Sequence, residues 1–114
     1  MAVSDRVRRQ VEKRDLACWH CGSTEGLVLH HRRNRGMGGS KLIDTAQNLI
    51  RVCQTYNSLM ESDPATAEDA REFGHKLQSW RDISDPLYDV PNLIWYTLTE
   101  AGEKERTEAP GYLI

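Results

Sequence analysis

The sequence has no long apolar run and few aromatic residues. Its best apolar stretch, residues 90–98, is short and interrupted by Pro91 and Asn92, whereas a membrane-spanning helix needs roughly 20 apolar residues. The N-terminal stretch "MAVSDRVRRQ" has no apolar segment after its charges, so no secretion signal is predicted and we expect a cytoplasmic protein. An apolar content of 39% with a single Phe predicts a modest core, for which a bound metal ion or a partner would add stability.

Cysteine is also scarce, and the three that occur are expected to be thiols or metal ligands rather than disulfides. Cys18 and Cys21 have the Cys-x₂-Cys spacing of a zinc knuckle, and Cys53 is the third thiol. Because a structural zinc ion takes four ligands, these three form an incomplete set. His20 or His75 could supply the fourth ligand, or the metal has been lost.

An overall basic charge is absent as well, since the formal net charge is −2. Residues 1–53 hold ten Lys and Arg against five Asp and Glu, whereas residues 54–114 hold five against twelve. The basic pI typical of a whole nucleic-acid-binding domain is therefore missing. The uneven charge is compatible with a basic half that contacts DNA, and equally with chance asymmetry of a solvated surface.

The length of 114 residues predicts one domain, residues 1–114, with a core at about 15–62 and an extension at about 63–114. The predicted fold class is α+β. Apolar periodicity and capping residues predict the following order: a helix over 5–14 capped by Ser4, a turn over 18–26, a strand over 27–31, a basic glycine-containing loop over 32–47, a strand over 48–53, helices over 54–62 and 64–73, a strand within 93–99, and a loose polar tail over 100–111.

The stretch "LHHRRNRGMGGS", residues 29–40, holds two of the four histidines side by side. Imidazole binds divalent metals and accepts a proton near neutral pH. Neighbours on a strand point to opposite faces, so His30 and His31 could serve one site only where the strand ends and the chain bends. For a His-His pair on its own, one ring in the core and one in solvent is the more ordinary arrangement.

Two asparagines extend this pattern, because Asn48 follows His31 by 17 residues and Asn57 follows Asn48 by nine. On a strand-loop-strand-helix background, the stretches "LVLHHRRNRGMGGS" and "NLIRVCQTYNSLME", preceded by "CWHC", resemble the HNH endonuclease family in the variant whose last His is Asn. More narrowly, "HHRRNRGMGGS" is similar to small HNH proteins of bacteriophages.

This resemblance implies a ββα-metal core with an N-terminal helix, a zinc-knuckle-like turn and a C-terminal helix and strand extension. His30 and Asn57 would bind one divalent cation, Mg²⁺ or Mn²⁺ before Zn²⁺ or Ni²⁺. His31 would be the general base, and Asn48 would hold the loop and orient His31. The family pattern usually has its fourth structural zinc ligand at the position of Tyr56, so either zinc is held without it or Tyr56 packs in its place.

The resemblance also implies DNA as the substrate, a phage terminase as a functional partner, and the bacterial host cytoplasm as the location. Beside the histidines, we expect four basic residues to contact DNA phosphates: Arg32, Arg33, Arg35 and Lys41. Two alternatives stay open. One is a catalytically weak DNA-binding or packaging accessory module, favoured by Asn57, the missing fourth cysteine and the negative net charge. The other is a structural zinc-knuckle interaction domain.

Overall fold

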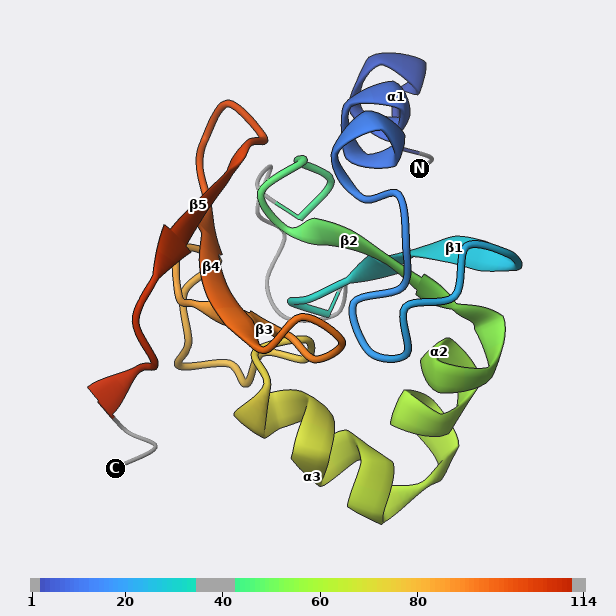
Figure 1. The fold of residues 1–114 in the computed structure, drawn as a ribbon, viewed down its shortest axis with the longest axis vertical. Helices are drawn as coiled ribbons and strands as arrows, with labels where there is room; N and C mark the ends of the chain where they lie inside the picture. The colour runs from blue at the N-terminus through green and yellow to red at the C-terminus, as the bar shows by residue number, and fades with distance from the viewer. Residues whose placement is uncertain (1–2, 35–42, 112–114) are drawn as a thin grey trace.

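The computed structural model describes residues 3–34 and 43–111 of the chain. Their α+β fold is built around a central antiparallel hairpin, β1–β2, with helix α1 on one side and helices α2 and α3 on the other (Figure 1). A second antiparallel sheet, in the order β3–β4–β5, lies beside the hairpin. The elements are α1 (Asp5–Arg14), β1 (Leu27–His31), β2 (Leu49–Cys53), α2 (Gln54–Ser62), α3 (Pro64–Glu72), β3 (Leu87–Asp89), β4 (Ile94–Leu98) and β5 (Lys104–Thr107).

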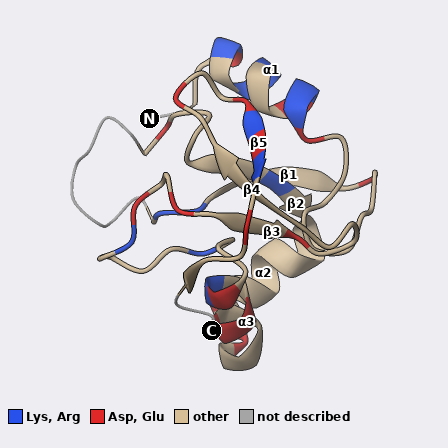
Figure 2. Cartoon of the chain, turned by 60° about the vertical axis from the view of Figure 1, so that its left-hand side comes forward, with Lys and Arg blue, Asp and Glu red and all other residues tan. Residues whose placement is uncertain are grey.

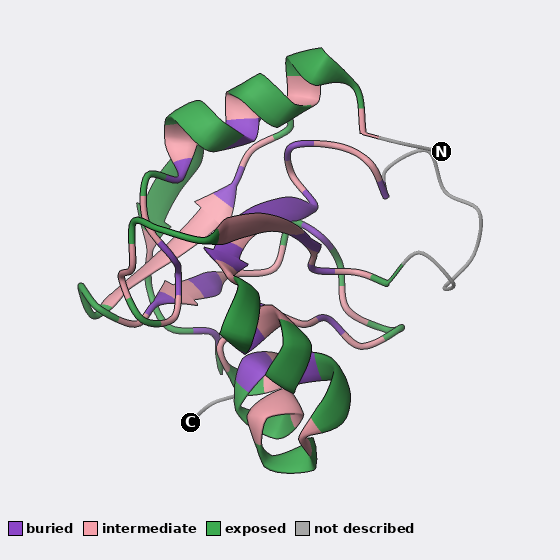
Figure 3. Cartoon of the chain, turned by 90° about the vertical axis from the view of Figure 1, so that its right-hand side faces the viewer, coloured by how far each residue is buried: buried purple, intermediate pink, exposed green. Residues whose placement is uncertain are grey.

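Helix α1 forms where the sequence predicts it. The Ser4 hydroxyl caps the helix by accepting a hydrogen bond from the Val7 backbone N–H at 3.2 Å. Val3, Val7 and Val11 recur at helical spacing, and Val11 is fully buried in a small apolar cluster with Leu49. The opposite face of α1 is exposed (Figure 3). One apolar stripe therefore fixes this helix against the hairpin.

Strand β2 leads directly into α2, so the predicted order of two strands followed by a helix is confirmed. In its register His31 lies opposite Leu49 and Leu27 lies opposite Cys53. Strand β2 begins at Leu49, one residue later than predicted. It is the more buried strand of the two, with Ile50 and two further apolar side chains in the core.

Helices α2 and α3 meet at Asp63, which ends the first helix and caps the second. Its carboxylate accepts hydrogen bonds from the backbone N–H and the hydroxyl of Thr66. On α2, Tyr56, Leu59 and Met60 recur at helical spacing; Tyr56 and Met60 are buried, whereas Leu59 is 41% exposed. The buried face of α2 is therefore narrower than its apolar pattern.

Gly74 ends the α3 region with a left-handed backbone, φ +75°. Any Cβ at this position would overlap the backbone of Pro86. Glycine is thus required twice, by the φ angle and by the close approach of the chain that leads to β3.

The tail differs from the prediction of a loose segment over 100–111. Strand β5 lies within it and pairs with β4 in a register that places Trp95 opposite Thr107. The turn between them closes through the backbone N–H of Gly102, which donates to the carbonyl of Thr99. Strand β3 was also not predicted, because it has only three residues. Both β3 and β5 are ordered because they pair with β4, despite the polar composition of β5.

The main core cluster joins both sheets to α2 and α3, so the C-terminal half is part of the same folded unit as the hairpin. Its buried members are Cys18, Trp19, Ile50, Val52, Tyr56, Met60, Ala70, Leu87 and Leu98. Figure 2 shows Lys and Arg gathered on α1 and mostly Asp and Glu on α3. None of the helices in the described ranges has the length and apolar character needed to cross a bilayer.

Candidate functional site

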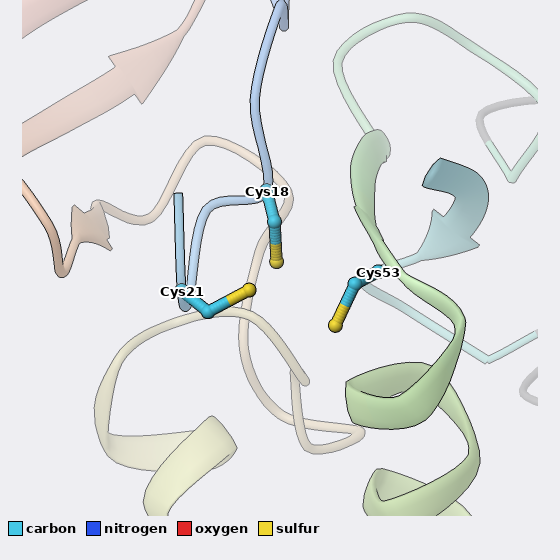
Figure 4. Close-up of side chains that lie close together, drawn as sticks. All are labelled: Cys18, Cys21 and Cys53. Carbon is cyan, nitrogen blue, oxygen red and sulfur yellow. The ribbon is translucent and has the colours of Figure 1, made fainter. Parts of the chain in front are cut away.

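Three cysteine side chains converge beside the start of α2 (Figure 4). Cys18 and Cys21 come from the turn after α1, and Cys53 ends β2. Their sulfur atoms all lie within 4.8 Å of one another, so the cluster could hold a metal ion. Three thiolates are ligands that suit a soft or borderline metal ion such as zinc.

Buried aromatic packing engages the residues that the sequence offered as a fourth ligand or as its replacement. The Tyr56 hydroxyl donates to Nδ1 of His75 at 2.7 Å, and His75 Nε2 donates to the Tyr88 carbonyl at 2.7 Å. Both His75 nitrogens are therefore engaged. His20 stacks on Tyr56 with ring centroids 4.0 Å apart. Among residues 3–34 and 43–111, no further His, Asp or Glu joins the three cysteines as a metal-binding group.

The thiols differ in environment. Burial raises the pKa of Cys18, whereas a hydrogen bond from the Ser23 backbone lowers the pKa of the exposed Cys21. Cys21 consequently loses its proton more readily than Cys18, and it is the most exposed of the three thiols. An incoming metal ion would meet this side of the cluster first.

A second candidate site is a cleft of about 430 Å³ between the end of β1, helix α2 and the segment after α3. His30, His31 and Asn57 all line it. The two neighbouring imidazoles can reach one cleft because β1 ends at His31 and the chain bends at the next residue. The three side chains that the sequence pattern singled out therefore share one cavity.

The His30 ring is held in a single orientation. Its Nε2 donates to the His75 carbonyl at 2.8 Å, since a carbonyl can only accept, which leaves Nδ1 as the lone-pair nitrogen. Burial lowers the pKa of His30 to about 4, although hydrogen bonding to His75 and to the Asn57 side chain opposes this shift. The ring is neutral at pH 7, the form that binds a metal.

His31 pairs with a residue that the sequence pattern did not single out. Its Nε2 lies 2.8 Å from the Asp44 Oδ1. A carboxylate at this position accepts from Nε2 and orients the imidazole, which leaves Nδ1 as the nitrogen with a lone pair. The ring nitrogen that can accept a proton is therefore Nδ1.

Asn48 closes the loop between the strands. Its side-chain oxygen accepts from the Arg33 backbone N–H at 2.8 Å, and its amide nitrogen donates to the Arg33 and Ile43 carbonyls at 3.1 and 2.9 Å. Arg33 comes shortly after His31, and Ile43 precedes Asp44. Fully buried Asn48 thus fixes the backbone on which both partners of the His31–Asp44 pair are carried.

The prediction that Arg32 contacts DNA is wrong. The residue is 0% exposed, and its guanidinium donates to the carbonyls of Gly74, Ile83 and Asp85 at 2.8–2.9 Å. Arg32 instead ties the end of β1 to the chain after α3. A buried cation with these partners is not available to a phosphate group.

The other predicted phosphate contacts differ in status. The half-buried Arg33 donates from Nη2 to the Ser79 carbonyl at 3.1 Å, and its role in DNA contact stays a prediction. Arg35 and Lys41 lie outside the described residues. Two cations that were not predicted, Arg71 and Lys76, line the cleft of the histidines, as does Glu61. Charged residues on a helix, such as Glu61 and Arg71, or just after one, such as Lys76, carry no sequence signal of their own, so only the fold reveals them.

Comparisons of the chain with protein-family models, curated proteins and solved structures found no match.

Proposed function

We propose that the protein is a divalent-metal-dependent DNA endonuclease of the HNH type, acting at the cleft lined by His30, His31 and Asn57. The observation that carries the proposal is the presence of these three side chains in one cavity, two from the end of strand β1 and one from helix α2. The resemblance of the sequence motifs adds to it. The proposed link to genome packaging and a terminase rests on that resemblance alone.

The donor set of the cleft fits a divalent cation. His30 is neutral and presents Nδ1, and Asn57 offers an amide oxygen from α2 close to the His30 ring. Mg²⁺ and Mn²⁺ favour such oxygen donors and leave room for water and phosphate. A bound cation would polarise a phosphate oxygen and offset the charge that develops at the phosphorus.

The protein side chains supply the proton transfer. His31 accepts a proton at Nδ1 from a water molecule whose oxygen forms a bond to the phosphorus. The P–O3′ bond breaks, and the released 3′ oxygen takes a proton from solvent to leave as a hydroxyl. Asp44 holds the His31 ring by the opposite nitrogen. Asn48 holds the backbone beside His31 and Asp44 in place. Arg71 and Lys76 line the same cleft, where they would contact the DNA backbone.

We also propose that the cluster of Cys18, Cys21 and Cys53 holds a structural zinc ion, with the fourth position open to water. The Tyr56 hydroxyl is engaged with His75, so it packs beside the cluster. Closing three chain segments on one ion would stabilise a small core.

The test is plasmid cleavage in Mg²⁺ or Mn²⁺ by wild-type protein and by His31→Ala. We expect His31→Ala to lower the rate by about 10²- to 10⁴-fold, because it removes the general base. DNA affinity measured by fluorescence anisotropy should be unchanged. His20→Ala, which removes an imidazole outside the cleft, is the matched control and should keep its activity.

A wild-type protein that binds DNA but cleaves it in no divalent cation would contradict the nuclease proposal. The accessory DNA-binding role would then be the better account. Equal cleavage rates for wild type and His31→Ala would show that the reaction does not use this cleft.

A further inference from the structure

The face of α2 that borders the cleft carries two oxygen donors. Asn57 and Glu61 are four residues apart, so their side chains lie one turn apart on the same side of the helix. Both line the cleft with His30. Glu61 is the only carboxylate among the described residues that line this cavity.

Glu61 is engaged with a replaceable partner. Its Oε2 accepts from Lys76 Nζ at 3.0 Å, and the Glu61 side chain is 63% exposed. Exposed ion pairs of this kind contribute only about 0–1 kcal/mol, so a divalent cation can displace the ammonium group at small cost.

Charge balance points to the same residue. His30 and Asn57 are both neutral, and Arg71 and Lys76 add positive charge to the cleft. Without Glu61, a divalent cation entering such a cavity would meet repulsion and no anionic ligand. Mg²⁺ and Mn²⁺ are usually bound by at least one carboxylate.

We propose that Glu61 is the third protein ligand of the cation in this cleft, and that Lys76 holds the Glu61 carboxylate until the cation takes its place. The inference rests on the proposed function. Once released from Glu61, Lys76 is free to turn to the phosphate of the substrate. Metal binding and DNA contact would thus be linked through one exchange of partners.

The test is Mn²⁺ affinity of the full chain, followed by the electron paramagnetic resonance signal of free Mn²⁺ in a titration without DNA. Glu61→Gln should weaken binding by about tenfold or more, since it removes the only negative ligand. Lys76→Met should tighten binding severalfold, because it removes the cation that competes for the carboxylate. Glu12→Gln, on the exposed face of α1, removes the same charge far from the cleft and should leave the affinity unchanged.

The opposite changes in Mn²⁺ affinity expected for Glu61→Gln and Lys76→Met distinguish a metal ligand from a purely structural residue. If the ion pair served stability alone, Glu61→Gln and Lys76→Met would both leave the Mn²⁺ affinity unchanged, and that result overturns the inference. The Mn²⁺ affinity of His30→Ala shows whether the cation binds in the cleft. Any binding that this variant keeps belongs to another site, including the thiols. If His30→Ala weakens binding and Glu61→Gln does not, the role of Glu61 fails while the proposed function stands. If the wild-type protein binds no Mn²⁺, or if His30→Ala binds Mn²⁺ as tightly as the wild type, the role of Glu61 and the proposed function both fail.

Discussion

Replacing Arg32 tests whether it is part of the core or a contact for DNA. Its guanidinium is buried and donates three hydrogen bonds, from Nε to the carbonyl of Gly74 and from the two terminal nitrogens to Ile83 and Asp85. Arg32→Ala would remove all three bonds, leave the carbonyls without this donor and open a cavity. The structure therefore predicts a loss of stability rather than a loss of DNA affinity alone.

The size of the effect follows from these contacts. A hydrogen bond from a charged donor contributes about 1.5–3 kcal/mol, and breaking a buried charged arrangement costs about 3–5 kcal/mol. Because the three bonds are not additive, we expect Arg32→Ala to lower the free energy of unfolding by about 5 kcal/mol. Arg32→Lys should lose roughly half as much, since one ammonium group cannot reach three carbonyls in a planar fork.

Urea unfolding followed by circular dichroism measures both variants, and Arg32→Lys gives a value if Arg32→Ala fails to fold. The control is Arg33→Ala, which removes one partly exposed hydrogen bond to Ser79 and should cost under about 1 kcal/mol. A phosphate contact would instead leave stability unchanged and reduce the salt dependence of DNA binding. An Arg32→Ala protein within about 1 kcal/mol of wild type refutes the structural role.

Three further predictions concern metal, pH and the backbone. Elemental analysis should find one zinc ion per wild-type chain and none in Cys21→Ser; zinc that is undiminished in Cys21→Ser would exclude the thiol cluster as its site. Burial lowers the pKa of His30 to about 4 and of His75 to about 3, so below pH ~6.5 the unfolded chain binds protons that the folded chain excludes. Stability should therefore fall on acidification by roughly 1 kcal/mol per pH unit for each histidine, and a flat urea-midpoint profile would contradict this. Gly74→Ala should lower the melting temperature through a loss of about 2 kcal/mol or more, while Gly111→Ala, which meets no neighbour, should not; equal melting temperatures would count against the strain at Gly74.

Local signals were sufficient for most of the secondary structure. Ser4 and Asp63 cap their helices through side-chain oxygen atoms, and the apolar and β-branched residues of β1 and β2 need no distant partner to be recognised. The polar β5 and the three-residue β3 carry no such signal. They are strands because they pair with β4, and this pairing is a property of the tertiary fold.

The candidate site shows the same division. Spacing along the chain singled out His30, His31 and Asn57, and the fold brings them to one cleft. The adjacent residues Arg32 and Arg33 are indistinguishable in a basic run of the sequence, yet only Arg32 is fully buried. The carbonyl groups that accept its hydrogen bonds lie 42 to 53 residues further along the chain, so the local sequence does not identify them. Asp44, Glu61 and Lys76 also owe their roles to such distant neighbours, which the sequence alone does not identify.

The segment after α3 sets a lower limit on how small a working version of this protein can be. The acceptors for His30, Arg32 and the Tyr56 hydroxyl all lie between residues 74 and 85. A shortened chain ending near Ser62 would keep every residue of the histidine-asparagine pattern. It would nevertheless leave three buried polar side chains without their hydrogen-bond acceptors. Any transplant of this hairpin and helix into another scaffold must therefore carry its C-terminal half along or rebuild those acceptors.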